Sequence, residues 1–213
     1  MHKKTIIDIP EPQPLVITEY TIPIYFCGHC NKEVMPTDKG LPVEGIFGPN
    51  LLAEITLMKN EDRLPYEKIA NVLNRQYGLD LTAATALDIN RRVADKLQGV
   101  YEGIKQDILN SSQVNADETG IKVQGRNYWT FLFMSLTSVL FMIRPCRGQK
   151  TIKEALGHEY KGILTCDGWT SYPKCVELIQ RCWAHLLREA KFLAEKYEGQ
   201  ARILYDDLCK IFK

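Results

Sequence analysis

Two aspartates, Asp117 and Asp167, stand where a β-sheet would bring acidic side chains together. Asp117 lies within residues 114–123, whose pattern predicts a strand, and Asp167 follows a second predicted strand at 162–166. If these strands are parallel neighbours, the two carboxylates converge. Carboxylates suit Mg²⁺, and two ions about 3.5–4 Å apart can activate water at a phosphodiester. An isolated aspartate before Gly168 is more often a turn residue, so the interpretation depends on the pair.

The second half of the chain contains the elements that must position these acids. The pattern predicts strands at 114–123, 128–135, 139–143, 162–166 and 178–183, and helices at 149–158, 185–197 and 201–212. Three antiparallel strands come first, and further strands follow through helical crossovers. This order predicts an α/β fold with a mixed sheet and flanking helices over residues 111–213.

Residues 45–110 form a predicted helical segment. Apolar residues at helical spacing indicate one helix from Asn50, a second from Pro65 that ends at Gly78, and a third at 82–97. The last two, joined by a short turn, are typical of a helix-turn-helix that binds DNA. An ordinary helical hairpin would give the same pattern.

Residues 1–44 read as an extended arm with a knuckle at Cys27-x-x-Cys30. Two cysteines at this spacing are half of a four-ligand zinc site, as in a zinc ribbon. A redox pair is the weaker interpretation, because the residues after Cys30 read as a strand rather than a helix. Cys27 and Cys30 are therefore candidate zinc ligands.

The overall composition is that of an ordinary globular protein. The 213 residues carry a net charge of +1, with 45% hydrophobic and 25% charged residues, so charge alone does not indicate DNA. No apolar run approaches the roughly 20 residues that span a bilayer, and no export signal opens the chain. The seven cysteines are then expected to be reduced in the cytoplasm.

Three motifs, in order, give a family resemblance. They are Ala116-Asp117-Glu118-Thr119-Gly120, then Cys166-Asp167-Gly168-Trp169-Thr170-Ser171-Tyr172, then Arg181-Cys182-Trp183-Ala184-His185-Leu186-Leu187-Arg188. This order resembles transposases of the insertion-sequence 66 family, within the wider DDE group, over roughly residues 23 to 200. The resemblance implies a ribonuclease-H-like core, with Asp117 and Asp167 as the first two catalytic acids binding Mg²⁺ or Mn²⁺. It also implies double-stranded DNA as partner, a homo-oligomer, and attack of a transposon 3′-hydroxyl on target DNA.

Three further residues near these motifs need a role. His185 and Arg188 lie one helical turn apart and can contact a DNA phosphate near the metal site. In the alternative, His185 packs or caps its helix and Arg188 is solvated. Glu118 adjoins Asp117, but on a strand its side chain points to the opposite face, so it is not expected to be a metal ligand.

The chain departs from the DDE pattern in its third acid, usually a glutamate on a late helix. Glu189, Glu195 and Glu198 are available, but none is assigned this role. We expect a chain truncated at its C-terminus, which binds DNA or metal without cutting. A decayed transposase that only binds DNA is one alternative. A thiol or zinc module with a helical interaction domain is another, and the sequence contexts of Asp117 and Asp167 argue against it.

Overall fold

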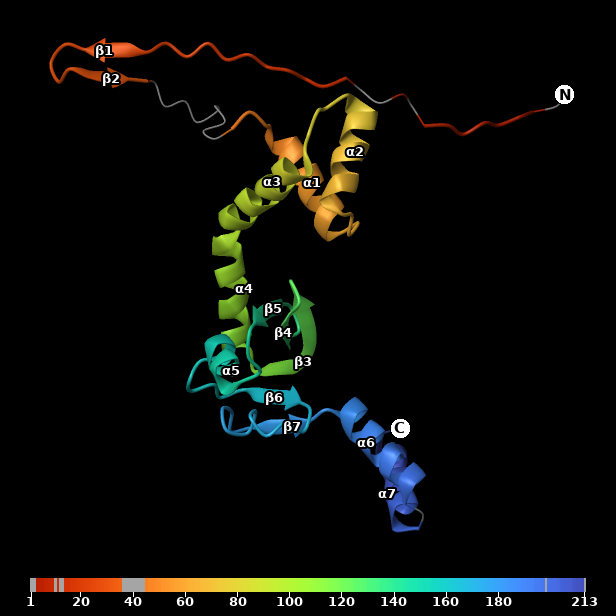
Figure 1. The fold of residues 1–213 in the computed structure, drawn as a ribbon. Coiled ribbons are helices and arrows are strands. Elements are labelled where there is room, and N and C mark those ends of the chain that lie inside the picture. Colours follow the sequence, from red (N-terminus) through yellow and green to blue (C-terminus); the bar gives the residue numbers. More distant parts are fainter. Residues whose placement is uncertain (1–2, 10, 12–13, 36–44, 198, 213) are drawn as a thin grey trace. The chain divides into compact units, whose positions relative to one another are not determined.

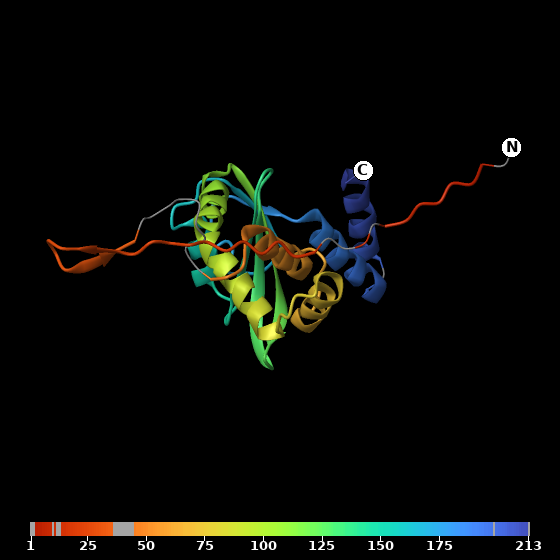
Figure 2. The same cartoon turned by 90° about the horizontal axis from the view of Figure 1, so that it is seen from above.

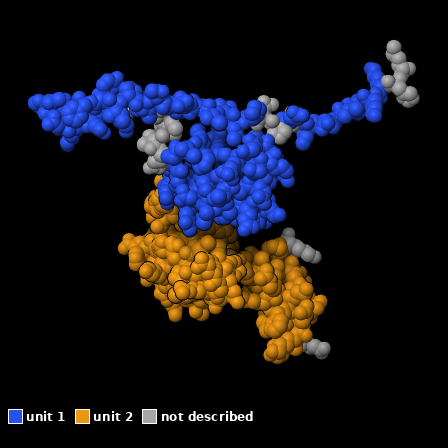
Figure 3. Space-filling view, turned by 45° about the horizontal axis from the view of Figure 1, so that its top comes forward, with its two compact units in different colours: residues 1–97 blue, residues 98–213 orange. Residues whose placement is uncertain are grey.

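A computed structural model describes residues 3–9, 11, 14–35, 45–197 and 199–212. The described chain divides into two compact units, residues 1–97 and 98–213, coloured separately in Figure 3. Each unit has its own cluster of buried apolar side chains. We therefore describe each unit separately.

The first unit contains a two-stranded hairpin and three helices. Strands β1 (Tyr25–Cys27) and β2 (Lys32–Val34) pair antiparallel, and helices α1 (Pro49–Asn60), α2 (Tyr66–Tyr77) and α3 (Ala83–Lys96) follow. Gly78 ends α2 in the left-handed conformation (φ 66°), which glycine adopts without a Cβ penalty. Thr82 caps α3 by accepting a hydrogen bond from the Thr85 amide. The part of the predicted helical segment 45–110 that lies in this unit is thus built as three short helices around Ile55, Ile69 and Ile89.

The second unit is built on a five-stranded mixed sheet of order β5-β4-β3-β6-β7. Its elements are α4 (Gln98–Asn110), β3 (Gln113–Val123), β4 (Arg126–Met134), β5 (Val139–Arg144), α5 (Gln149–Leu156), β6 (Ile163–Cys166), β7 (Ile179–Arg181), α6 (Trp183–Lys196) and α7 (Gln200–Phe212). β3, β4 and β5 pair antiparallel, and β3, β6 and β7 pair parallel. The α/β prediction with a mixed sheet is confirmed, and its order is consistent with a ribonuclease-H-like core. The zinc-ribbon and helix-turn-helix parts of the prediction stay predictions.

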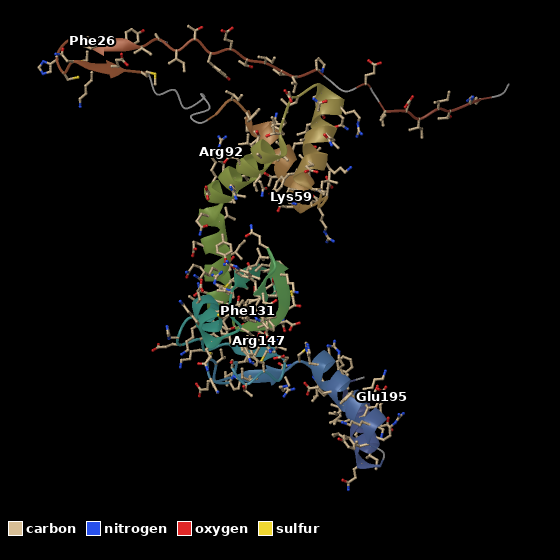
Figure 4. The ribbon with its side chains drawn as sticks, viewed as in Figure 1. Phe26, Lys59, Arg92, Phe131, Arg147 and Glu195 are labelled. Atoms are coloured by element: carbon tan, nitrogen blue, oxygen red, sulfur yellow. The ribbon has the colours of Figure 1, made fainter. Side chains whose placement is uncertain are left out.

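One face of the sheet forms the core of the second unit. Alternate strand residues such as Val114, Phe131 and Met142 are fully buried, as the period-2 alternation of a strand requires. Ile108 of α4 and Ile152 of α5 pack in the same cluster. Figures 1 and 2 show α4 alongside the sheet, and Figure 4 marks Phe131 in its interior.

The α6–α7 hairpin extends from the end of β7, and its two helices pack mainly on each other (Figure 1). Ala190 and Ala194 are the buried residues of α6, and Trp183 contacts the Phe212 ring with centroids 5.6 Å apart. Among the described helices, none combines the length and the apolar character that crossing a membrane requires.

Candidate active site

The parallel pairing of β3 with β6 positions the two candidate acids. Asn115 lies opposite Thr165 in this pairing, and Asp117 and Asp167 each follow two residues later. Asp117 still lies within β3 and is exposed, whereas Asp167 follows immediately after the end of β6. Continuing the register by two residues brings the acids to matching positions, at the point where β6 ends.

Main-chain amides orient both carboxylates. The amide of Glu118 donates to Oδ1 of Asp117 at 3.0 Å, and the amide of Trp169 donates to Oδ1 of Asp167 at 2.8 Å. Neither Oδ2 accepts a hydrogen bond within the described part of the chain, although Oδ2 of Asp167 lies 3.8 Å from the Arg147 guanidinium. Two anionic oxygen donors fit Mg²⁺ or Mn²⁺, which prefer hard ligands and keep several waters.

A wider ligand cluster is absent from the described residues. They contain no group of three or more His, Cys, Asp or Glu side chains arranged to hold a metal ion. Glu189 forms an ion pair with Arg181 at 3.1 Å, and Glu195 forms one with Lys191 at 3.8 Å. Glu198 lies outside the described residues.

His185 lies in the first turn of α6, which starts close to the end of β6. The amide of Cys182, at the N-cap of α6, donates a 2.8 Å hydrogen bond to the carbonyl of Cys166. The neighbouring Cys182 thiol raises the pKa of His185, and the negative charge of Asp117 raises it further. The Nδ1 atom of His185 is buried without a hydrogen-bond partner. The His185 imidazole and the Asp117 carboxylate therefore interact electrostatically.

Arg188 lies one turn beyond His185 on α6 and is exposed. Its positive charge acts to lower the pKa of the His185 imidazole, so the two basic groups are close to each other. Two adjacent basic groups on one helical turn make a local site for an anion such as a phosphate.

A buried cluster beside Asp167 could not be predicted from the sequence. Its centre is the Glu118 carboxylate, which accepts hydrogen bonds from Arg147 and from the Tyr172 hydroxyl. The Arg147 guanidinium lies over the rings of Trp129 and Trp169, 5.0 and 4.3 Å from their centroids. Burial, followed by the hydrogen bond to Glu118, raises the pKa of Tyr172. Of these residues, only Trp169 and Tyr172 belong to the sequence motif that contains Asp167.

The cysteine pair lies in the first unit, on the β1–β2 hairpin. Cys27 ends β1 and Cys30 lies in the turn, where Asn31 adopts a positive φ of 52°. Hydrogen bonds from the backbone amides of Cys30 and His29 lower the pKa of the Cys27 thiol. The hairpin places the two thiols on one turn, and the described residues contain no group of three or more side chains that could hold a metal there.

Comparison with protein families identifies the chain. No curated protein matches the sequence. The family model described as "Transposase IS66 family" matches residues 44–213, which include α1 to α7 and the whole sheet. This match spans most of the chain and contains both acids, the motif around His185 and the helical segment. The chain therefore belongs to the IS66 transposase family.

Proposed function

We propose that the chain acts as a DDE-type DNA transposase, which binds transposon ends and carries out metal-dependent phosphodiester cleavage and strand transfer. The observation that carries the proposal is the matching position of Asp117 and Asp167 on neighbouring parallel strands. Two carboxylates brought together in this way can hold metal ions that assist phosphoryl transfer. The family supports the same chemistry.

In this proposal each residue has a defined task. Asp117 and Asp167 would hold Mg²⁺ or Mn²⁺, oriented by the amides of Glu118 and Trp169. The bound ions would activate the attacking oxygen and stabilise charge on the leaving oxygen. His185 and Arg188 would bind a phosphate of the DNA backbone and fix its position at the sheet edge. No covalent intermediate with the protein is required.

The remaining parts of the chain would bind partners. Within the helical segment 45–110, α2 and α3 would bind the transposon ends as a helix-turn-helix, with duplex DNA as the partner. Cys27 and Cys30 would contribute half of a zinc site that a second pair of ligands completes. The working form would be a homo-oligomer, because two transposon ends must be joined in one reaction.

A non-catalytic DNA-binding protein is the second candidate. It is favoured by the lack of a group of three acidic side chains arranged to hold a metal among the described residues, in which Glu189 pairs with Arg181 and Glu195 with Lys191. This candidate keeps the metal-binding acids and loses only cleavage. Metal-dependent nicking of a supercoiled plasmid by the chain would exclude it.

Calorimetric titration with Mn²⁺ tests the metal site directly. We expect the chain to bind Mn²⁺, and we expect Asp117→Asn and Asp167→Asn each to weaken binding at least about tenfold. Asp107→Asn is the matched control, because Asp107 is an exposed aspartate of the same unit whose carboxylate accepts from Ser138 at 3.0 Å. Equal binding by all four proteins would overturn the proposed function.

A further inference from the structure

We propose that Glu118 is a positioning residue that holds the Arg147 guanidinium and keeps it from pairing with the Asp167 carboxylate; this inference rests on the proposed metal site. Glu118 lies on the buried face of β3, and its side chain is 1% exposed. Nε of Arg147 donates to Oε1 of Glu118 at 2.8 Å, and Nη2 donates to the same oxygen. The Tyr172 hydroxyl donates to Oε2. A carboxylate this deeply buried is stabilised by such hydrogen-bond partners.

Aromatic rings fix the Arg147 guanidinium as well. Its central carbon lies 5.0 Å from the Trp129 centroid and 4.3 Å from the Trp169 centroid, within the range of cation–π attraction. Trp169 is also the residue whose amide donates to Asp167. The guanidinium, the ring and the carboxylate are therefore parts of one connected group, in which Figure 4 labels Arg147.

The distances divide the charge of Arg147 unequally. Arg147 makes direct hydrogen bonds to Glu118, whereas its Nη2 atom lies 3.8 Å from Oδ2 of Asp167, beyond hydrogen-bond length. The guanidinium thus pairs with Glu118 and not with Asp167. Oδ2 of Asp167 is left without a hydrogen bond to Arg147, so it can bind a divalent metal.

Glu118 acts on both acids. Its amide donates to Asp117, and its carboxylate holds the arginine beside Asp167. A glutamate next to the first acid therefore has a role that needs no direct contact with the metal. The Glu118 side chain points to the buried face of β3 and that of Asp117 to the exposed face, as the alternation of a strand dictates.

Removal of the Glu118 charge is the sharpest test. In Glu118→Gln the guanidinium loses its counter-charge, and we expect it to move onto Asp167. In a metal-free crystal structure of this variant, the separation of Nη2 and Oδ2 should fall from 3.8 Å to about 3 Å. Calorimetry should show Mn²⁺ binding weakened about tenfold, because the positive guanidinium at Asp167 would repel the Mn²⁺ ion.

The double variant Glu118→Gln/Arg147→Met separates positioning by charge from plain structural support. It leaves no unpaired buried charge, so it should fold and bind Mn²⁺ within about threefold of the unaltered chain. A double variant that binds as weakly as Glu118→Gln, or a Glu118→Gln that binds normally, overturns the proposal. Arg144→Met is the matched control, because Arg144 is equally exposed (33%) and pairs with Glu154 elsewhere in the unit.

The two readouts also keep this inference apart from the proposed function. If the unaltered chain takes up no Mn²⁺, the metal site fails. The crystal structure of Glu118→Gln still decides on the positioning role, which is overturned if Arg147 stays 3.8 Å from Asp167.

Discussion

The amide of Cys182 donates a 2.8 Å hydrogen bond to the carbonyl of Cys166, so these two residues lie on neighbouring segments. The pKa values of their thiols shift in opposite directions. Burial raises the pKa of Cys166 to about 11. At Cys182 burial acts in the same direction, but the nearby polar groups, the His185 imidazole and the amides of His185 and Ala184, prevail and lower its pKa. Thiolate is the reactive form, so Cys182 should react with iodoacetamide at neutral pH at least about tenfold faster than Cys166. Peptide mass spectrometry over time measures both rates.

Substitution of His185 tests the origin of this reactivity. In His185→Gln the imidazole no longer stabilises the thiolate, so the pKa of Cys182 should rise. A thiolate is present above its pKa and lost as pH falls through it, so alkylation of Cys182 should slow at neutral pH and recover at high pH. The exposed Cys146 provides an internal reference for access of the reagent. An unchanged rate at neutral pH would contradict the pairing of Cys182 with His185.

Metal binding at the sheet edge should also appear as thermal stabilisation. A ligand at about 100 times its dissociation constant stabilises the folded form by about 2.7 kcal/mol. We expect Mn²⁺ to raise the unfolding temperature of the chain by several degrees, and to raise that of Asp107→Asn equally. Asp117→Asn should show a clearly smaller rise, because tenfold weaker binding lowers the stabilisation at the same Mn²⁺ concentration to about 1.4 kcal/mol or less. A full rise in Asp117→Asn would mean that Mn²⁺ binds elsewhere.

The strands of the sheet could be predicted, but helix α4 could not. Alternation of apolar residues marks β3 and β4 directly, because each strand buries one face. Helix α4 contains Gly99 and Gly103, which lower helix propensity and weaken the pattern. It forms because Ile108 is buried against the sheet, a tertiary contact that its own sequence does not announce.

The candidate site was predictable only where its residues belong to local motifs. Asp117, Asp167 and His185 stand in short recognisable contexts. Arg147 has no such context, and its sequence position is 29 residues from that of Glu118, to which it donates. Tyr172, which also donates to Glu118, is 54 residues from it in the sequence. Such pairs are set by where the segments after β5 and β6 lie in the folded unit, which a single sequence does not reveal.

The basic turn of α6 should contribute to DNA affinity. We expect His185→Gln and Arg188→Gln each to weaken binding of a duplex oligonucleotide about threefold to tenfold at low salt. Arg188→Gln should also reduce the slope of log affinity against log salt by about one, because one phosphate contact is lost. Fluorescence anisotropy measures both. Arg202→Gln is the control, since Arg202 is exposed on α7 and paired with Asp206 at 3.3 Å. An equal loss in the control would indicate general charge rather than a site.

The core of the second unit should depend on Phe131, which is fully buried at the centre of the sheet. Phe131→Ala removes a ring that the surrounding strands cannot replace, so the free energy of unfolding should fall by about 3–5 kcal/mol. Phe141→Ala is the matched control, because Phe141 lies on β5 and is 60% exposed; its loss should stay within about 0.5 kcal/mol. The three tryptophans, Trp129, Trp169 and Trp183, all lie in this unit, so urea unfolding followed by their fluorescence reports on it alone. Similar losses in both variants would mean that the two faces of the sheet are equally covered.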